Sequence, residues 1–414
     1  MSRLRNKLVE VTGDSLSGQL APRVSRAFLR PFLGAGQSLA AVFAALRFVV
    51  VAAGAVGRVM AEDLARLAPA ELLIVDPKSY HPDSIVTQPI RPSEIGGAKA
   101  ELTARACKEI SPATRVSYFT GLIQELSLPT LARFDRVVLS SDNLLAELET
   151  GQICTRLGLP LDHASVHPET MVVHVRSFSN ENGDSPCPAC QFSAQERELL
   201  NREVEFPCDG MPGGTVRPEV TSAPTASNPS LCGLAAKLAM TGLLRDTMGL
   251  GATPTRDCML EYCGFTQHSV VNDLRRNPDC PCEHLRYTVM PASRPLERCS
   301  LGELAGLGGL ADPLDFTVGD WCWAERGLCT RGHDQVVGRF VRAEQELVGA
   351  CSRCGEPLGR QRFFLHQRLS IPCFETMGHR PLHELGAKEV EWVLARGEEA
   401  GLLFHNPVRE HEQS

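Results

Sequence analysis

The sequence has few aromatic side chains and no excess of positive charge. Its 414 residues include three Trp and four Tyr, and 42 Lys and Arg stand against 49 Asp and Glu, a net charge of −7. Stacking surfaces for single-stranded nucleic acid need aromatic residues, and bulk binding to nucleic acid or anionic membrane needs a basic surface. We therefore expect neither nucleic acid nor membrane as a partner.

A membrane-spanning run and a signal-peptide pattern are also missing. The apolar stretch 39–56 is interrupted by Arg47, and each flank is shorter than the roughly 20 residues that cross a bilayer. The first residues contain no apolar segment followed by a cleavage site. With 43% hydrophobic and 22% charged residues, the composition is that of a globular chain of two to three domains at about 150 residues each. We expect a cytoplasmic protein.

Cysteine is the one residue type in unusual supply, with 16 copies. Without a signal peptide, pairs at Cys-x-x-Cys spacing favour metal ligands over disulfides. Cys187 and Cys190 form such a pair, and Cys280 and Cys282 form a closer one. Because a turn supplies two thiolates at a time to a tetrahedral site, we predict that these four hold a structural Zn²⁺. His284 is the alternate fourth ligand, and buried thiols without metal are the alternative.

A third pair, Cys351 and Cys354, resembles half of a second zinc site. The residues that would complete it stay open: Cys322 and Cys329 upstream, or Cys373 and His379 downstream.

From residue 48 onward the hydrophobic pattern alternates between strands and helices. The run 48–51 is typical of a strand buried on both faces, and a turn containing Gly54 and Gly57 leads into a helix over 58–67. A second apolar strand, 72–75, ends at Asp76. Further segments are expected as helices over 99–110, 143–157 and 231–244, and as strands over 115–118, 136–140, 171–178 and within 259–271. This alternation predicts an α/β fold with a Rossmann-like, doubly wound, mostly parallel sheet.

Residues suited to a nucleotide follow the predicted strands. Small residues in the turn let backbone amides approach phosphate, and Asp76 stands about twenty residues on, where a carboxylate can accept from ribose hydroxyls. So far an NAD-dependent dehydrogenase fits equally well. Lys99 and Asp142 favour ATP, because an ammonium suits a triphosphate and a carboxylate at the end of a strand can hold Mg²⁺.

These motifs in this order resemble the ubiquitin-activating-enzyme superfamily of ThiF/MoeB/HesA type. The matching stretch runs from about Phe48 to Cys282 and contains AAGAVG, LLIVDP, EIGGAKAE, VLSSDN, SPCPACQF and RRNPDCPC. The resemblance implies ATP-dependent adenylation of the C-terminal glycine of a ubiquitin-like protein. The matched positions imply a role for each residue: Gly54 and Gly57 in the nucleotide loop, Asp76 at the ribose, Gln88 in the nucleotide site, Lys99 at the phosphates and Asp142 at the magnesium.

One family position differs in this chain. The family usually carries an Asn and, three positions on, an Arg followed by Gln, whereas the sequence here has Ser84, Thr87 and Gln88. The missing Arg would neutralise triphosphate charge. Arg91, or an arginine from the N-terminal segment or from a dimer partner, could substitute for it. A member that keeps the fold without catalysis is the alternative.

Some members of this superfamily pass the activated carboxylate to a cysteine as a thioester, and others stop at the adenylate. Cys208 lies in the Pro- and Gly-rich crossover loop, where the family keeps its catalytic cysteine when it has one. Cys232, in the first turn of the following helix, is the second candidate. We expect the thioester on Cys208, with the absence of a catalytic cysteine as the alternative.

The expected organisation has three parts: a helical N-terminal segment over 1–46, a ThiF/MoeB-like adenylation domain with a zinc site over 47–285, and a small C-terminal domain over 286–414. We expect a homodimer that uses ATP, Mg²⁺ and Zn²⁺, with a conjugating-type enzyme as a further partner. A sulfur-carrier protein or a peptide, modified without a thioester, is the alternative substrate.

Overall fold

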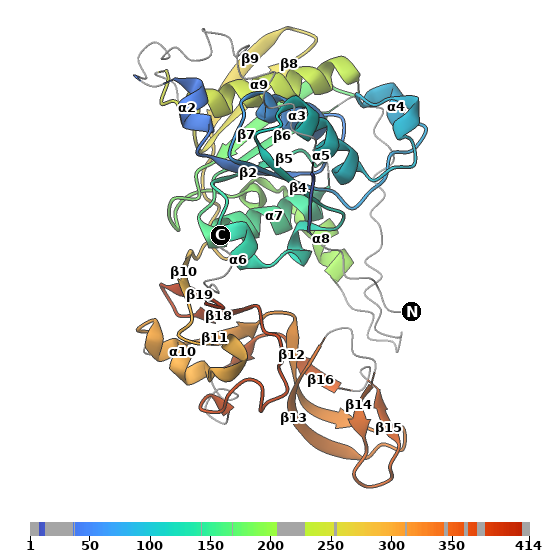
Figure 1. Ribbon diagram of the computed structural model, residues 1–414, viewed down its shortest axis with the longest axis vertical. Coiled ribbons are helices and arrows are strands. Elements are labelled where there is room, and N and C mark those ends of the chain that lie inside the picture. The colour runs from blue at the N-terminus through green and yellow to red at the C-terminus, as the bar shows by residue number, and fades with distance from the viewer. Residues whose placement is uncertain are drawn as a thin grey trace. The chain divides into compact units, whose positions relative to one another are not determined.

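The computed structural model describes residues 8–12, 36, 38–141, 143–167, 169–204, 228–251, 255–310, 313–342, 347–359, 363–370 and 377–407. The chain divides into two compact units, the first formed mainly by residues up to His284 and the second mainly by Leu285–Ser414 with the short segment Ser127–Pro129, and Figure 1 shows the elements of each. Within the described ranges, no helix has both the length and the apolar character needed to cross a membrane.

A nine-stranded sheet forms the first unit, in the order β1-β4-β3-β2-β5-β6-β7-β8-β9. Its five central strands, from β4 to β6, pair in parallel, and the outer pairs are antiparallel. The α/β prediction is thus confirmed. The strands are β1 Val9–Glu10, β2 Arg47–Val51, β3 Glu71–Val75, β4 Arg115–Phe119, β5 Arg136–Leu139, β6 Leu161–His167, β7 Val172–Phe178, β8 Cys258–Cys263 and β9 His268–Asp273.

Helices cover both faces of this sheet. Figure 1 shows α3, α5 and α9 on one face and α7 on the other. Apolar side chains of α3, α5 and α9 pack with those of the central strands in one continuous core. The bounds are α2 Leu39–Phe43, α3 Gly57–Arg66, α4 Ser84–Thr87, α5 Lys99–Ile110, α6 Leu128–Ala132, α7 Leu144–Leu157, α8 Ala194–Val204 and α9 Pro229–Thr247.

The strand order creates a switch point between β2 and β5. After β2 the chain proceeds to β3 and β4 on one side, and then returns to place β5 and β6 on the other. The loops that leave the carboxyl ends of β2 and β5 therefore diverge, and open α/β sheets bind ligands in the crevice between such loops.

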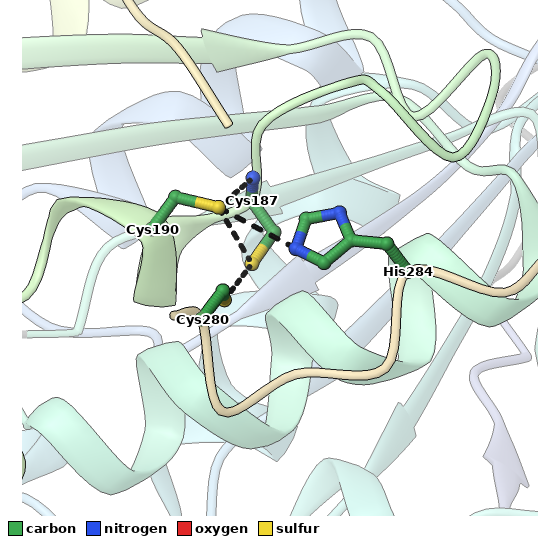
Figure 2. Close-up of side chains that lie close together, drawn as sticks. All are labelled: Cys187, Cys190, Cys280 and His284. Carbon is green, nitrogen blue, oxygen red and sulfur yellow. Dashed lines mark hydrogen bonds between the residues drawn. The ribbon is translucent and has the colours of Figure 1, made fainter. Parts of the chain in front are cut away.

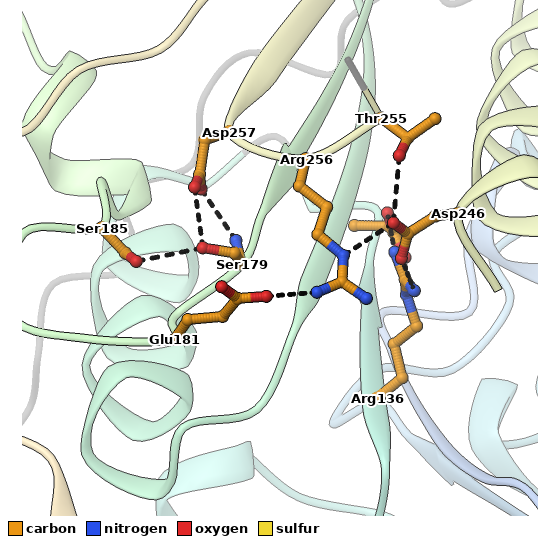
Figure 3. A network of polar contacts seen from close by, with 9 residues as sticks. Arg136, Ser179, Glu181, Ser185, Asp246, Thr255, Arg256 and Asp257 are labelled. Atoms are coloured by element: carbon orange, nitrogen blue, oxygen red, sulfur yellow. Dashed lines mark hydrogen bonds and ion pairs between the residues drawn. The ribbon is translucent and has the colours of Figure 1, made fainter. Parts of the chain in front are cut away.

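A buried polar network lies at the opposite end of these strands, as Figure 3 shows. Arg136, the first residue of β5, pairs with Asp162 of β6 and with Asp246 of α9, the latter at 2.5 Å. Arg256 donates to the same Asp246 carboxylate at 2.7 Å. Arg136, Asp162 and Asp246 are buried and satisfy one another's charge where an unpaired charge would be strongly destabilising, while Arg256 reaches Asp246 from the exposed side.

The helical prediction for residues 1–46 is wrong for Val9–Glu10, which pair antiparallel with β4 at the edge of the sheet. An open strand edge offers unpaired N–H and C=O groups, and these override a local helical preference. In the same segment, α2 is helical, and Phe43 stacks on Phe48 of β2 with 5.9 Å between the ring centroids.

The second unit is built mainly of strands. Its larger sheet has the order β10-β19-β18-β11-β12-β13, with β16 added beside β12 and β17 beside β11, and β14 and β15 form a separate two-stranded sheet. The helix α10, Leu301–Leu307, packs in its core. The strands are β10 Tyr287–Pro291, β11 Asp315–Val318, β12 Trp321–Leu328, β13 Asp334–Arg342, β14 Leu347–Ala350, β15 Pro357–Gly359, β16 Phe363–His366, β17 Leu369–Ser370, β18 Trp392–Arg396 and β19 Gly401–His405.

Candidate functional site

The glycine turn after β2 lies at the switch point, and its two glycines do different work. A Cβ on Gly57 would stand 1.9 Å from the carbonyl oxygen of Ala52 and 2.3 Å from Oγ of Ser140, so only glycine fits there. A Cβ on Gly54 would meet nothing within 4 Å. Gly57 therefore keeps α3 tight against the sheet, and the backbone at Gly54 is open to an approaching ligand.

The N-terminus of α3 points a set of backbone amides at this turn. The helix begins at Gly57, and no side chain caps it. The N–H of Arg58, the second residue of α3, already donates to the carbonyl of Gly54 at 3.1 Å, and the helix dipole makes this end of α3 partly positive. Together with the open backbone at Gly54, this end of α3 suits a phosphate group.

Asp76 connects the end of β3 to the turn. Its carboxylate is 4% exposed and accepts hydrogen bonds from the backbone N–H of Ala53 at 2.7 Å and of Lys78 at 2.8 Å. Burial raises the pKa of Asp76, while Lys99 and the two N–H donors oppose that rise. Each carboxylate oxygen keeps a further lone pair, so Asp76 can accept from additional hydroxyl groups.

Backbone pairing brings Lys99 to the same place. Ser79 and Ala98 form a bridge, and the N–H of Lys99 donates to the carbonyl of Lys78 at 2.9 Å. This fixes the start of α5 beside the end of β3. The Lys99 ammonium lies 5.5 Å from the centre of the Tyr80 ring. Two predicted site residues, Asp76 and Lys99, are thus brought together.

Tyr80 and Arg58 were not predicted from the sequence. The buried Tyr80 hydroxyl donates to the carbonyl of Ala53 at 3.2 Å and receives a hydrogen bond from Arg58 at 3.3 Å. The Arg58 guanidinium also pairs with Glu62 at 3.2 Å and Glu94 at 2.8 Å. Arg58 is therefore engaged in holding the turn and does not replace the arginine missing at residue 87. Arg58 and Tyr80 are 22 positions apart in the sequence, so no local sequence pattern predicts the hydrogen bond between them.

Gln88 supplies an observation that fits a ligand. Its side-chain oxygen Oε1 is buried and has no hydrogen-bond partner among the described atoms. A buried acceptor without a partner is costly, typically by about 1–3 kcal/mol, so such atoms commonly mark a place for a bound group. Thr87 beside it is half-buried, and Arg91, the nearest candidate substitute cation in the sequence, is exposed.

Asp142 lies outside the described residues, but both of its neighbours are fixed. The carbonyl of Ser141 lies 3.1 Å from Nε2 of His163, and Asn143 caps α7 by accepting from Leu145 at 2.8 Å. Burial, with Arg176 nearby, lowers the pKa of His163 to about 3. His163 is therefore neutral and holds the end of β5 by a hydrogen bond without adding charge.

Figure 2 shows a group of metal-ligating side chains, in which Cys187 and Cys190 face Cys280 and His284. Their ligand atoms all lie within 4.8 Å of one another, with 3.6 Å between the sulfurs of Cys187 and Cys280. Nδ1 of His284 is 3.0 Å from the carbonyl oxygen of Ser185, and Nε2 is 3.4 Å from the sulfur of Cys190. A hydrogen bond at Nδ1 leaves Nε2 as the ligating atom.

The group contains His284, the alternate ligand, where the sequence analysis put Cys282 first. Cys282 is 5% exposed and interacts with the thiols of Cys187 and Cys280, yet its sulfur is not part of the mutually close set. Three thiols and an imidazole form a donor set that could bind Zn²⁺ tetrahedrally.

A second group lies in the C-terminal unit and consists of Cys329, His333, Cys351 and Cys354. It includes the predicted pair and one of the suggested partners, Cys329. His333 was not predicted, although its spacing of four from Cys329 was a usable signal. Cys322 and His379 are outside this group, and Cys373 lies outside the described residues.

Of the two candidate nucleophiles, Cys208 lies outside the described residues. Cys232, in the first turn of α9, is 2% exposed and packs in the core of the first unit. A thiol packed in apolar surroundings is a poor nucleophile.

Comparison with known proteins identifies the family. The sequence matches the ThiF family over residues 29–282, more than half of the chain. The chain belongs to the ThiF family. Its first unit therefore has the adenylyltransferase fold of that family.

Two solved structures of E. coli MccB are similar to this ThiF-family chain. MccB with succinimide has 14% identity and a TM-score of 0.45, covering 59% of this chain and 69% of that one. MccB with ATP has 15% identity and a TM-score of 0.45, with the same coverage. PaaA has 13% identity and a TM-score of 0.42, covering 57% of this chain and 67% of that one. The search of curated proteins gave no match.

Proposed function

We propose that this ThiF-family protein is an ATP-dependent activating enzyme that adenylates the C-terminal glycine of a ubiquitin-like protein. The observation that carries the proposal is the contact of Asp76 with the glycine turn, beside Lys99 at the switch point. A carboxylate, a cation and open helix amides at one edge of the sheet match the ribose, phosphates and backbone approach that ATP requires.

Each residue has a defined task in this scheme. The turn at Gly54 and the first amides of α3 hold phosphate oxygens, Asp76 accepts from the ribose hydroxyls, and Lys99 neutralises phosphate charge. Gln88 gives its partnerless Oε1 to a donor on the bound substrate. Asp142, at the carboxyl end of β5, would hold Mg²⁺, which when bound draws charge from the departing phosphates.

The reaction joins two substrates without a covalent enzyme intermediate in its first step. A carboxylate oxygen of the terminal glycine attacks the α-phosphorus of ATP. The bond from that phosphorus to the bridging oxygen breaks, and pyrophosphate leaves with the electron pair. Charge builds up on the phosphate oxygens, so the protein's contribution is positioning and positive charge from Lys99 and the amides.

The family usually has an arginine at the position of Thr87, so the positive charge of that arginine must come from another residue in this chain. Arg58 is committed to Tyr80, Glu62 and Glu94, whereas Arg91 is exposed a few residues beyond Thr87. We propose Arg91 as the substitute, with an arginine of the N-terminal segment or of a second subunit in a homodimer as the alternative. An Arg91→Ala variant with lower kcat and unchanged ATP affinity would support the first option.

A second step is proposed at Cys208. Its thiolate would attack the carbonyl carbon of the acyl adenylate, AMP would leave, and the resulting thioester would pass to a conjugating-type enzyme. Cys232 is the weaker candidate because it is packed in the core. If no thioester forms, the substrate is a sulfur carrier or a peptide that is activated only as the adenylate.

We also propose that Cys187, Cys190, Cys280 and His284 bind one structural zinc. All four coordination positions would come from the protein, which closes the site to substrate. The zinc would join the segment after β7 to the end of the first unit, and its role is to hold these segments rather than to react.

Carrier-dependent exchange of labelled pyrophosphate into ATP tests the proposal. Wild type with a glycine-terminated ubiquitin-like protein should exchange, and Asp142→Ala should not, while Asp135→Ala serves as the control. Exchange that survives in Asp142→Ala would overturn the role of that residue. A wild-type chain that neither binds ATP nor exchanges would be a non-catalytic scaffold, the alternative that Thr87 favours.

A further inference from the structure

The second Cys/His group joins two hairpins of the C-terminal unit. Cys329 and His333 stand in the connection between β12 and β13, and Cys351 and Cys354 stand between β14 and β15. The sulfurs of Cys329 and Cys354 are 3.7 Å apart, and the sulfur of Cys351 is 3.7 Å from Nδ1 of His333. Each ligand pair thus contacts the other pair.

Each of the two connections contains a tight turn that is closed by the backbone N–H of a glycine. The N–H of Gly332 donates to the carbonyl of Cys329 at 2.9 Å, and the N–H of Gly355 donates to the carbonyl of Cys351 at 2.8 Å. Both glycines have left-handed φ values, +77° and +73°, which other residues rarely adopt. Such tight turns let one short segment supply two ligands.

Backbone N–H groups donate hydrogen bonds to these sulfurs, and such bonds stabilise negative charge on a thiolate. The N–H of His333 donates to the sulfur of Cys329 at 3.3 Å, and the N–H of Arg353 donates to the sulfur of Cys351 at 3.4 Å. A metal binds thiolates, so these donors favour the ligating form.

Around this group, the described residues provide no ordinary apolar core. The buried cluster here consists of Cys329 and Cys351, with Cys354 packed against them. Strands β14 and β15 pair only with each other in the described part of the chain. A two-stranded hairpin is marginal at best in water, and small units of this kind are commonly held by a metal.

We propose that Cys329, His333, Cys351 and Cys354 bind one Zn²⁺, separate from the cluster at Cys187 and independent of adenylation. Three soft thiolates and an imidazole select zinc over oxygen-preferring cations. Because the protein supplies all four ligands, the site is structural, and it substitutes for a core between the two hairpins.

Metal content of the full-length chain tests this assignment. The double variant Cys351→Ser, Cys354→Ser should hold one zinc equivalent less than wild type after purification under reducing conditions. Cys322→Ser, on β12 in the same unit but outside the group, is the matched control and should hold as much zinc as wild type. Equal zinc in the double variant and wild type would overturn the proposal.

A second measurement needs no variant and so avoids misfolding. The native chain is alkylated with and without a zinc chelator, and each cysteine is quantified by peptide mass spectrometry. Cys329, Cys351 and Cys354 should become reactive together when the chelator is present, whereas Cys263 at the end of β8 should not change. Equal reactivity of the three thiols with and without chelator would refute the site.

Discussion

The carboxylate of Asp76 accepts the backbone N–H of Ala53 at 2.7 Å, so the residue directly after β3 also holds the turn that follows β2. The two residues are 23 positions apart and meet only because β2 and β3 are parallel neighbours. A change at Asp76 therefore acts on the turn as well as on any bound ribose.

We predict that Asp76→Ala weakens ATP binding tenfold or more and lowers the free energy of unfolding by about 1–3 kcal/mol, because two backbone N–H groups lose their acceptor. Calorimetric titration with ATP and urea unfolding measure the two effects. Asp135→Ala is the control, since this exposed carboxylate accepts the N–H of Arg47 at 2.8 Å at the far end of the sheet. Unchanged ATP affinity in Asp76→Ala would refute its role at the ribose.

We predict that substitutions at the two turn glycines have different effects: a loss of stability at Gly57 and a loss of ATP affinity at Gly54. Gly57→Ala should unfold the region or cost several kcal/mol, because its Cβ would overlap the carbonyl of Ala52. Gly54→Ala should fold with wild-type stability, because its Cβ meets nothing, yet it should bind ATP more weakly. Urea unfolding and ATP titration separate the two. Wild-type ATP affinity in a folded Gly54→Ala would show that phosphate does not approach there.

His163 predicts a pH dependence of stability. Its folded pKa is about 3, below the ordinary value near 6.5 for the unfolded chain, so the unfolded state binds the proton first. Its contribution is full above pH 6.5 and is lost as the pH falls toward 3, by up to about 1.4 kcal/mol per pH unit. The free energy of unfolding, measured with urea at pH 7.5 and at pH 5.5, should fall less between these two pH values for His163→Gln than for wild type.

The exposed His268 on β9 supplies the control for that measurement, since His268→Gln also removes one histidine. An identical fall in the free energy of unfolding in wild type and His163→Gln would show that His163 does not titrate as its burial requires.

We predict that substitution of the ligands in the first Cys/His group removes its metal. Cys187→Ser combined with Cys190→Ser should lose one zinc equivalent and much of its stability, because structural zinc binding is part of the folding free energy. His284→Ala should lose zinc, whereas Cys282→Ser should retain it. Plasma mass spectrometry of reduced protein reads the outcome, and the opposite result for these two residues would restore Cys282 as the fourth ligand.

Thioester formation is predicted to depend on Cys208. With labelled carrier protein and ATP, wild type should give a band on a non-reducing gel that dithiothreitol removes. Cys208→Ala should lose that band and keep pyrophosphate exchange, because the adenylate needs only the ATP site. Cys232→Ala, which changes a thiol packed in the core, should keep both. The reverse pattern would make Cys232 the nucleophile.

The sequence predicted those elements whose own residues specify them. Continuous apolar runs gave β2 and β3, and the helix at 99–110 agrees with α5 at both ends. Strand β6 was missed because it carries Asp162 and His163, which are poor strand formers by composition. Their partners, Arg136 and Arg176, lie on other strands, so burial of these polar groups becomes possible only in three dimensions.

In the site, too, some residues could be predicted from local sequence and others only from the three-dimensional contacts. Asp76 and Lys99 follow strand and helix ends and could be predicted from spacing, whereas Tyr80 and Arg58 act through contacts that no spacing reveals. His333 was missed for a related reason. Its spacing of four from Cys329 was a usable signal, but that pair could be joined to Cys351 and Cys354 only once the two hairpins were known to meet, and no pattern in the C-terminal half had predicted those hairpins.

The first Cys/His group draws Cys190 from just beyond β7 and Cys280 from just beyond β9. A metal held there would close the intervening chain into a ring. Such a ring is closed only while the site is folded, because the metal ligands come together in the folded chain, and it requires no oxidising environment. After a protease cut between these two cysteines, the metal would still join the two fragments under native conditions, and a chelator would weaken their association.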